Sequence, residues 1–120
     1  MNVSVNVKTN SAEWAELINN ASEKMLTVVA QQMLNDSLKY VPKAEGALRD
    51  SGTIDKVNGE VALVWDTPYA QAQWFGISNG GTIKNYTTPG TTKMWVEAAR
   101  AKYGKNWQQV AQNAFDAGLE

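Results

Sequence analysis

The residues that could carry acid, base or nucleophilic chemistry in this chain are few, and none of them forms a known catalytic pattern. Asp50 stands beside Ser51, but the chain contains no His to activate a serine and no Cys to act as a thiolate. Asp55 and Asp66 are isolated carboxylates, and no spacing marks a Ser–Lys pair. The sequence therefore favours a protein that is not an enzyme, with an unrecognised Ser or Asp site as the alternative.

Nothing in the chain predicts a metal or a cofactor. The carboxylates do not cluster, no EF-hand spacing occurs, and the lack of Cys removes thiolate metal sites. The segment "ISNGGTIKN" has glycines and a lysine, but it lacks the spacing of a phosphate-binding P-loop and is more typical of a turn. We therefore expect no metal and no cofactor.

The charge of the chain argues against a dedicated nucleic-acid binder. Lys and Arg together number 11, Asp and Glu number 12, and the net charge is −1. Neither a basic face nor a high pI is therefore expected. No stretch approaches the roughly 18 apolar residues of a membrane span, and no secretory h-region is present. These features predict a soluble, unexported protein without membrane contact.

Hydrophobic alternation predicts the strands that would position functional side chains. The valines of "NVSVNV" alternate with polar residues near the amino terminus, which is the period of a half-buried strand. The run "GTIDKVNGEVALVWD" contains Asn58 and Gly59, the preferred pair for a type I′ turn. This run predicts a hairpin with strands at about residues 53–57 and 60–66.

Helical spacing predicts two long helices. The first runs from about Ser11 to Lys39, with Asn10 and Glu13 as a capping box at its start and Pro42 preventing its continuation. The second follows Pro89, and Gly104 either interrupts it or is tolerated within it. The apolar positions of the second helix are Trp95, Ala98, Ala99, Tyr103, Trp107, Val110, Ala111, Ala114 and Phe115.

The region between the hairpin and the second long helix contains a short helix and a segment rich in turn residues. In "TPYAQAQWFG", Thr67 is the expected N-cap, Pro68 the first helical residue and Gly76 the end. The following "ISNGGTIKNYTTPGTT" is either a hairpin around residues 79–81, with Ile83 and Tyr86 as strand residues, or a mobile loop.

Together these elements predict an α+β fold. We expect a small mixed sheet of three or more strands, including a β-hairpin, packed against a long N-terminal helix and a C-terminal helix. A chain of 120 residues is long enough to bury one core without disulfides. We expect a single domain over residues 1–120, with a flexible loop at about residues 77–91.

The aromatic residues allow more than one interpretation. Trp74 and Phe75, with Tyr69 before them, either dock a short helix onto the sheet or form a recognition patch, and docking is the favoured interpretation. Trp95 and Trp107 are separated by about three and a third helical turns, so they share a face only loosely. This spacing allows one of them to lie in the core and the other at an interface.

Three segments, in this order, resemble one protein family. The first, "VPKAEGALRDSG", resembles the stretch after the first long helix in minor capsid, neck and tail-completion proteins of tailed phages and prophages. That stretch commonly reads Pro, two or three variable residues, Gly, x, Leu, Arg, x, Ser. The residues of this chain that match are Val41, Pro42, Gly46, Leu48, Arg49 and Ser51.

The other two segments strengthen the resemblance. "WDTPYAQAQWFG" is similar to the family's segment of Tyr-Ala followed by an aromatic residue and Gly, and "YTTPGTTKMWVEAARAKYGKNWQQVAQNAF" is similar to the C-terminal helix of the minor capsid branch. The resemblance covers roughly residues 12–116. Ala44 and Glu45 depart from the usual acidic residue and Thr before the Gly, which affects the details of the turn.

The resemblance implies a structural protein at the phage head–tail junction, without catalysis. It implies a subunit of a homo-oligomeric ring in the virion, present in the host cytoplasm during assembly, with portal-side and tail proteins as partners. DNA would pass through the lumen of the ring without specific binding. The alternative function is a small peptide- or ligand-binding module that uses a cleft near the hairpin and Trp74.

The stretch "YVPKAEGALRDSG" is expected to be mainly architectural. Pro42 and Gly46 would turn the chain, Leu48 would anchor the turn in the core, and Arg49 and Ser51 would hold it in register with the hairpin. Alternatively, Arg49 pairs with a nearby Asp or binds backbone carbonyls after the long helix. The candidate subunit-interface residues are Arg49, Ser51, Trp74, Ile83 and Tyr86.

Overall fold

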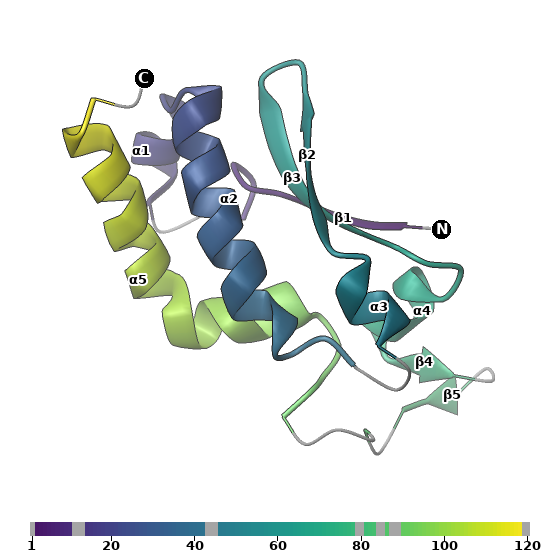
Figure 1. Ribbon diagram of the computed structural model, residues 1–120. Helices are drawn as coiled ribbons and strands as arrows, with labels where there is room; N and C mark the ends of the chain where they lie inside the picture. Colours follow the sequence, from purple (N-terminus) through teal and green to yellow (C-terminus); the bar gives the residue numbers. More distant parts are fainter. Residues whose placement is uncertain are drawn as a thin grey trace.

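A computed structural model describes residues 2–10, 14–42, 46–78, 81–83, 86 and 90–118. A small antiparallel sheet and two long helices form the body of the molecule (Figure 1). The α+β class predicted from the sequence is confirmed. In chain order the elements are β1 (Asn2–Asn6), α1 (Ala15–Asn19), α2 (Glu23–Leu38), α3 (Ala47–Asp50), β2 (Thr53–Val57), β3 (Glu60–Asp66), α4 (Ala70–Phe75), β4 (Ile77–Ser78), β5 (Gly81–Thr82) and α5 (Trp95–Asp116).

The main sheet has the strand order β1-β3-β2, with both pairings antiparallel. The predicted hairpin is confirmed, because Asn58 and Gly59 take positive φ angles of 53° and 79° between β2 and β3. The sequence predicted a mixed sheet, whereas the three strands of this sheet are antiparallel throughout. Opposite neighbours such as Val3 and Trp65 point to the same face, so alternation places the apolar side chains together.

The single helix predicted from about Ser11 to Lys39 is wrong, because the chain forms two helices. The first ends at Asn19, and α2 begins at Glu23 with Ser22 as its N-cap. The Ser22 hydroxyl accepts a hydrogen bond of 3.2 Å from the backbone N–H of Met25. Such capping satisfies a free donor and favours a new helix start over continuation. The capping box expected at Glu13 lies outside the described residues.

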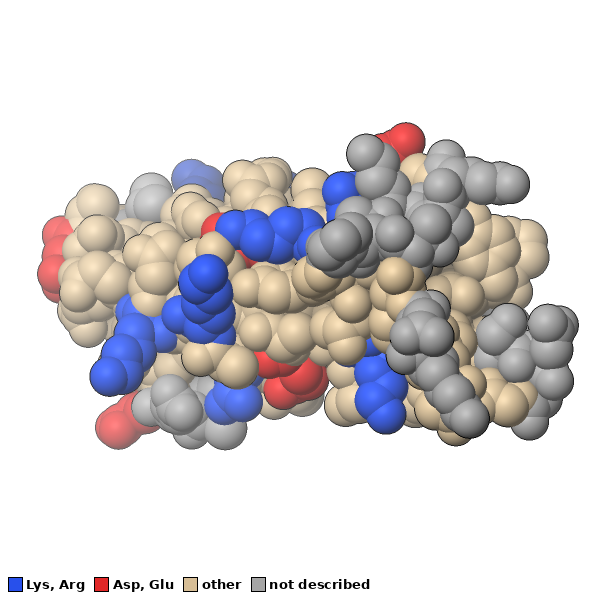
Figure 2. Space-filling model, turned by 90° about the horizontal axis from the view of Figure 1, so that it is seen from below, with Lys and Arg blue, Asp and Glu red and all other residues tan. Residues whose placement is uncertain are grey.

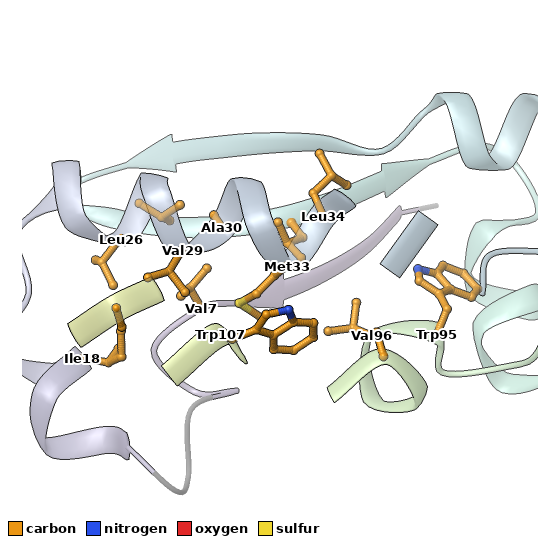
Figure 3. Close-up of a cluster of buried hydrophobic side chains, with 14 of the residues drawn as sticks. Val7, Ile18, Leu26, Val29, Ala30, Met33, Leu34, Trp95, Val96 and Trp107 are labelled. Atoms are coloured by element: carbon orange, nitrogen blue, oxygen red, sulfur yellow. The ribbon is translucent and has the colours of Figure 1, made fainter. Parts of the chain in front are cut away.

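Helix α2 lies between the sheet and α5 over most of its length (Figures 1 and 3). One side of α2 packs on β2 and β3 and the other on α5, so this helix is apolar around much of its circumference. Its buried residues are Met25, Leu26, Val29, Ala30, Met33, Leu34 and Ser37.

Helix α5 tolerates the buried Gly104 and bends along its length (Figure 1). Trp95 and Trp107 are both fully buried. The proposal that one of them lies at an interface is therefore wrong for the isolated chain. Because α5 bends, the spacing of a straight helix does not give the relative orientation of the two tryptophans. Each of them packs against a different part of the core (Figure 3).

The short helix before residue 77 begins later than predicted. Tyr69, rather than Thr67, is the N-cap of α4, and the buried Thr67 hydroxyl has no hydrogen-bond partner among the described residues. The predicted end is confirmed, because Gly76 takes the left-handed conformation with φ 72°. Strands β4 and β5 pair as a short hairpin, which favours the hairpin interpretation. The prediction that Ile83 and Tyr86 are strand residues is wrong, because β5 ends at Thr82 and both residues lie outside the strands. Parts of the loop predicted at 77–91, namely 79–80, 84–85 and 87–89, lie outside the described residues.

Candidate assembly surfaces

The turn after α2 leads into α3 through a glycine that has no easy substitute. Gly46 takes a φ of 83° as the N-cap of α3, a conformation that a side chain disfavours. Leu48 is only 2% exposed and joins the core, while Pro42 is also buried. The structure therefore places Pro42, Gly46 and Leu48 within the body of one subunit.

Arg49 and Ser51 make hydrogen bonds inside the chain. The Arg49 Nη2 donates to the Val41 carbonyl oxygen at 3.0 Å, which links α3 to the residues after α2. The Ser51 hydroxyl donates to the Leu48 carbonyl oxygen at 2.7 Å and accepts from the backbone N–H of Asp66 at 3.2 Å. The second Ser51 bond joins α3 to the end of β3. Both side chains are half-buried, so their main contacts in the isolated chain hold the turn against the hairpin.

A tryptophan cluster joins α4, β3 and α5. Trp95 packs edge-to-face on Trp65, with ring centroids 5.5 Å apart, and on Trp74, with centroids 4.8 Å apart. The backbone N–H of Met94 also donates to the Trp74 carbonyl oxygen at 2.9 Å. Trp74 is thus half-buried and fixes α4 against the start of α5.

Apolar side chains remain exposed beside this cluster. Phe75 is 55% exposed and Ile77 is 47% exposed, so the expectation that Phe75 docks on the sheet is wrong. Ile83 and Tyr86 are half-buried and lie next to them. The Ile83 N–H donates to the Gly76 carbonyl oxygen, and a Cβ on Gly76 would contact the Tyr86 hydroxyl. The set that we call the α4–β4 surface consists of Trp74, Phe75, Ile77, Ile83, Tyr86 and Met94.

The sequence analysis predicted Trp74, Ile83 and Tyr86 of this surface as interface residues and considered Phe75 for a recognition patch, with docking favoured. It did not predict Ile77 and Met94. Gly76 marked the end of α4 in the sequence, but no local signal indicated that Phe75 and Ile77 on either side of it are exposed. Met94 takes a positive φ of 47° at the start of α5, a conformation that is uncommon for such a side chain.

A second apolar surface lies at the other end of the molecule. Trp14 and Leu17 of the α1 region and Phe115 of α5 line a groove of about 630 Å³, together with polar residues such as Glu16 and Gln112. Phe115 is half exposed there. The molecule extends 47 Å along its longest axis, and Figure 1 shows α1 and the end of α5 far from α4 and β4.

The cleft expected near Trp74 lies along β1 rather than beside the β2–β3 hairpin. It is lined by Val3 and Val5 of β1 and by Gln71, Trp74 and Phe75, and its volume is about 210 Å³. Pockets that bury a small ligand usually have volumes of about 300 Å³ or more. The cleft therefore gives little support to a ligand-binding module.

One pair of titratable side chains perturbs each other's protonation. The Lys39 ammonium donates to the Tyr103 hydroxyl, and it also lies 4.4 Å from the centroid of the Tyr103 ring. This hydrogen bond raises the pKa of Lys39 and lowers the pKa of Tyr103. Both groups lie on the surface, where such a contact does not form a catalytic site by itself.

No other chemical centre is found in the part of the chain that the structure describes. Its His, Cys, Asp and Glu residues form no group of three or more that could hold a metal ion. Among the same residues, no helix is both long and apolar enough to cross a membrane.

Comparison with known proteins identifies the family. A family model described as "Minor capsid protein" matches residues 3–115, nearly the whole chain. The chain therefore belongs to this family of phage minor capsid proteins, which gives it a structural role in the virion. No curated protein and no solved structure gives a match.

Proposed function

We propose that this protein is a non-catalytic subunit of an oligomeric ring that joins head and tail in a phage virion. The observation that carries the proposal is the presence of two different apolar surfaces at opposite ends of one elongated chain. They are the α4–β4 surface and the groove between α1 and the end of α5. Family membership supplies the setting, since minor capsid proteins are structural.

Two unlike surfaces favour a ring over a simple dimer. A two-fold dimer uses the same patch on both subunits, whereas a ring joins one patch to a different patch of the next copy. The exposed Phe75 and Ile77 supply an apolar projection, and the groove beside Trp14 supplies a concave surface lined by both apolar and polar side chains. In a head-to-tail arrangement, each copy would insert its projection into one neighbour and receive the other neighbour's projection in its groove.

The proposal also includes the other partners expected at the head–tail junction. Portal-side proteins and tail proteins would contact the two faces of the ring, and assembly would take place in the host cytoplasm before the virion is complete. Arg49 and Ser51 would act mainly by positioning the turn, because their polar groups already bond within the chain. Contact of these two residues with a neighbour stays a prediction.

The test replaces the two most exposed residues of the α4–β4 surface. The variant Phe75→Ser with Ile77→Ser should keep the melting temperature of the isolated chain nearly unchanged, because both side chains are about half exposed. It should abolish the joining of heads to tails when it replaces the wild-type protein in the phage, as counted by electron microscopy. The matched control is Val28→Ser with Val57→Ser, two exposed apolar residues outside both surfaces.

Three outcomes would contradict the proposal. Phage lacking the protein that still yields complete tailed particles would exclude a role at the junction. Normal joining with the Phe75 and Ile77 variant would show that the α4–β4 surface is not used. Equal loss with the Val28 and Val57 control would show that assembly is sensitive to any exposed apolar change.

A further inference from the structure

Cationic side chains gather on one face of the molecule despite the net charge of −1. Figure 2 shows several Lys and Arg side chains projecting from the face that is seen from below. The group at the bend of α5, which we call the α5 basic patch, consists of Lys39, Arg100, Lys102 and Lys105. The sequence argued against a basic face because composition reports a sum, whereas these four cations come together only in the fold.

Tyr103 holds two of these cations close together. The Lys39 ammonium lies 4.4 Å from the ring centroid and the Lys102 ammonium lies 5.6 Å from it. Attraction to the ring face partly offsets the repulsion between the two ammonium groups. Lys39 comes from just after α2 and Lys102 from α5, so the packing of the two helices creates this pair.

The other cations surround a hollow where a glycine lacks a side chain. Arg100, Lys102 and Lys105 line a depression of about 250 Å³ together with Gly104 and Glu97. The nearest atom that a Cβ at Gly104 would meet is the Arg100 Cγ, at 3.6 Å. Gly104 itself is buried, so the depression offers a small anionic group the three surrounding cations rather than the helix backbone.

The positive charge of the patch is only partly neutralised. Arg100 lies 3.7 Å from the Glu97 carboxylate and forms an ion pair with it. Asp36, the acidic residue nearest in sequence to Lys39, accepts hydrogen bonds from Trp107 and Gln32. The Asp36 charge also acts on Lys39 and contributes to its raised pKa. None of Lys39, Lys102 and Lys105 forms an ion pair with a carboxylate of the described residues.

We propose that the α5 basic patch binds the phosphate backbone of duplex DNA without reading its sequence. The ligand is the sugar–phosphate chain, contacted by Lys39, Arg100, Lys102 and Lys105, with one phosphate near Gly104. The proposal goes beyond the structural role at the junction and does not rest on ring formation. Such contacts suit a protein past which DNA moves, because contacts to phosphate do not depend on the base sequence.

Duplex DNA fits the patch better than an acidic protein does. Protein interfaces usually bury apolar and aromatic side chains at their centre, whereas DNA interfaces are more polar and more positive. The large exposed apolar residues of the described chain do not line the depression at Gly104.

Fluorescence anisotropy with a labelled duplex of mixed sequence, about 20 base pairs long, tests the proposal on the isolated protein. The variant Lys102→Gln with Lys105→Gln removes two exposed cations of the patch. The control, Lys24→Gln with Lys56→Gln, makes the same charge change at exposed positions elsewhere. Circular dichroism melting curves establish that both variants fold.

We expect weak wild-type binding that falls steeply with salt, since each phosphate contact contributes about 0.9 to the slope of log K against log salt. The patch variant should lower this slope by about 2 and weaken binding roughly tenfold at about 50 mM salt, while the control should bind like the wild type.

Three results would overturn the proposal. No wild-type binding at about 20 mM salt and about 100 μM protein would exclude the site, because phosphate contacts are strongest at low salt. Equal weakening in the control would show only a general charge effect. Tighter binding of polyglutamate than of DNA, lost in the same patch variant, would assign the surface to an acidic protein.

Discussion

A methyl group at Gly52 would collide with the indole of Trp65, which makes this glycine a test of close packing. A Cβ there would lie 2.6 Å from the Trp65 Nε1 and 3.2 Å from the Leu34 Cδ1. Both neighbours belong to the core, so Gly52→Ala should lower the free energy of unfolding by about 1–3 kcal/mol. Urea denaturation measures the change.

Gly104→Ala is the matched control for this substitution. Its Cβ would make only an ordinary contact, 3.6 Å from the Arg100 side chain, and the residue lies inside a helix. Alanine should therefore stabilise the protein by about 0.5–1 kcal/mol. If Gly52→Ala were as stable as Gly104→Ala, the close approach of Gly52 to Trp65 would be wrong.

Lys39 and Tyr103 make a pH-dependent pair on the surface. Hydrogen bonding to the ammonium lowers the pKa of Tyr103 below its ordinary value of 10.0, and the same bond raises the pKa of Lys39 above 10.5. Absorbance titration of tyrosinate should therefore show Tyr103 ionising before it would in a free peptide. The difference between wild type and Tyr103→Phe isolates its signal, and Lys39→Met should return its pKa towards 10.0.

The sign of the stability effect follows from the two pKa shifts. The Lys39 contribution is fully present below pH 10.5 and is lost as pH rises through its higher folded-state pKa. The Tyr103 contribution is present above pH 10.0 and is lost as pH falls through its lowered folded-state pKa. The stability difference between wild type and Lys39→Met should thus be largest between about pH 10 and 10.5. A difference that does not change with pH would contradict this coupling.

At the scale of the elements, one polar contact joins α2 and α5 within their apolar interface. The Trp107 Nε1 donates to the Asp36 carboxylate at 2.7 Å, and the Gln32 amide donates to the same oxygen at 3.1 Å. Asp36→Ala would leave the buried indole N–H without this acceptor, which should cost about 1–3 kcal/mol of unfolding free energy in urea denaturation.

Asn35→Ala is the control on the neighbouring exposed face of α2. Asn35 accepts a hydrogen bond only from the exposed Gln31 side chain, so water can replace it at little cost. The control should change stability by less than about 0.5 kcal/mol. Equal effects of the two substitutions would show that the Asp36 contact with Trp107 adds nothing to the α2–α5 interface.

Elements with strong local signals were predictable from the sequence, and the break between α1 and α2 was not. The β2–β3 hairpin rests on Asn58 and Gly59, whose backbone preference decides the turn without distant contacts. The apolar stripe keeps helical spacing from Leu17 through Ala21 to Met25, so it passes over the break. The two helices separate because the Ser22 cap and the packing of α1 on α5 outweigh that periodicity.

The candidate surfaces were predictable only in part, for a similar reason. Arg49 and Ser51 stood out as polar residues in a motif, yet their partners, Val41 and Asp66, became visible only in the fold. The exposure of Phe75 depends on which side of α4 the tryptophan cluster covers, and local spacing does not determine that side. The α5 basic patch needs Lys39 and Lys102 to meet across two helices.

At the scale of the whole molecule, the exposed apolar residues are too dispersed for strong self-association. Stable interfaces usually bury about 800 Å² on each partner, and the α4–β4 surface and the α1–α5 groove are separate, small areas. We expect sedimentation velocity to show mainly monomer at micromolar concentration, with rings forming on a partner or at high concentration. A stable large ring at micromolar concentration without a partner would contradict this expectation.

The strand order has a consequence for the time course of folding during synthesis. β1 is made before β2 and β3, but it pairs only with β3, the last of the three strands to be made. Until residues up to Asp66 have left the ribosome, β1 has no partner and the sheet-facing side of α2 lacks its contacts with β3. Such long-range pairing delays folding and leaves apolar surface open to wrong contacts. We therefore expect a nascent chain halted before β3 to bind chaperones more than one halted after β3 has left the ribosome.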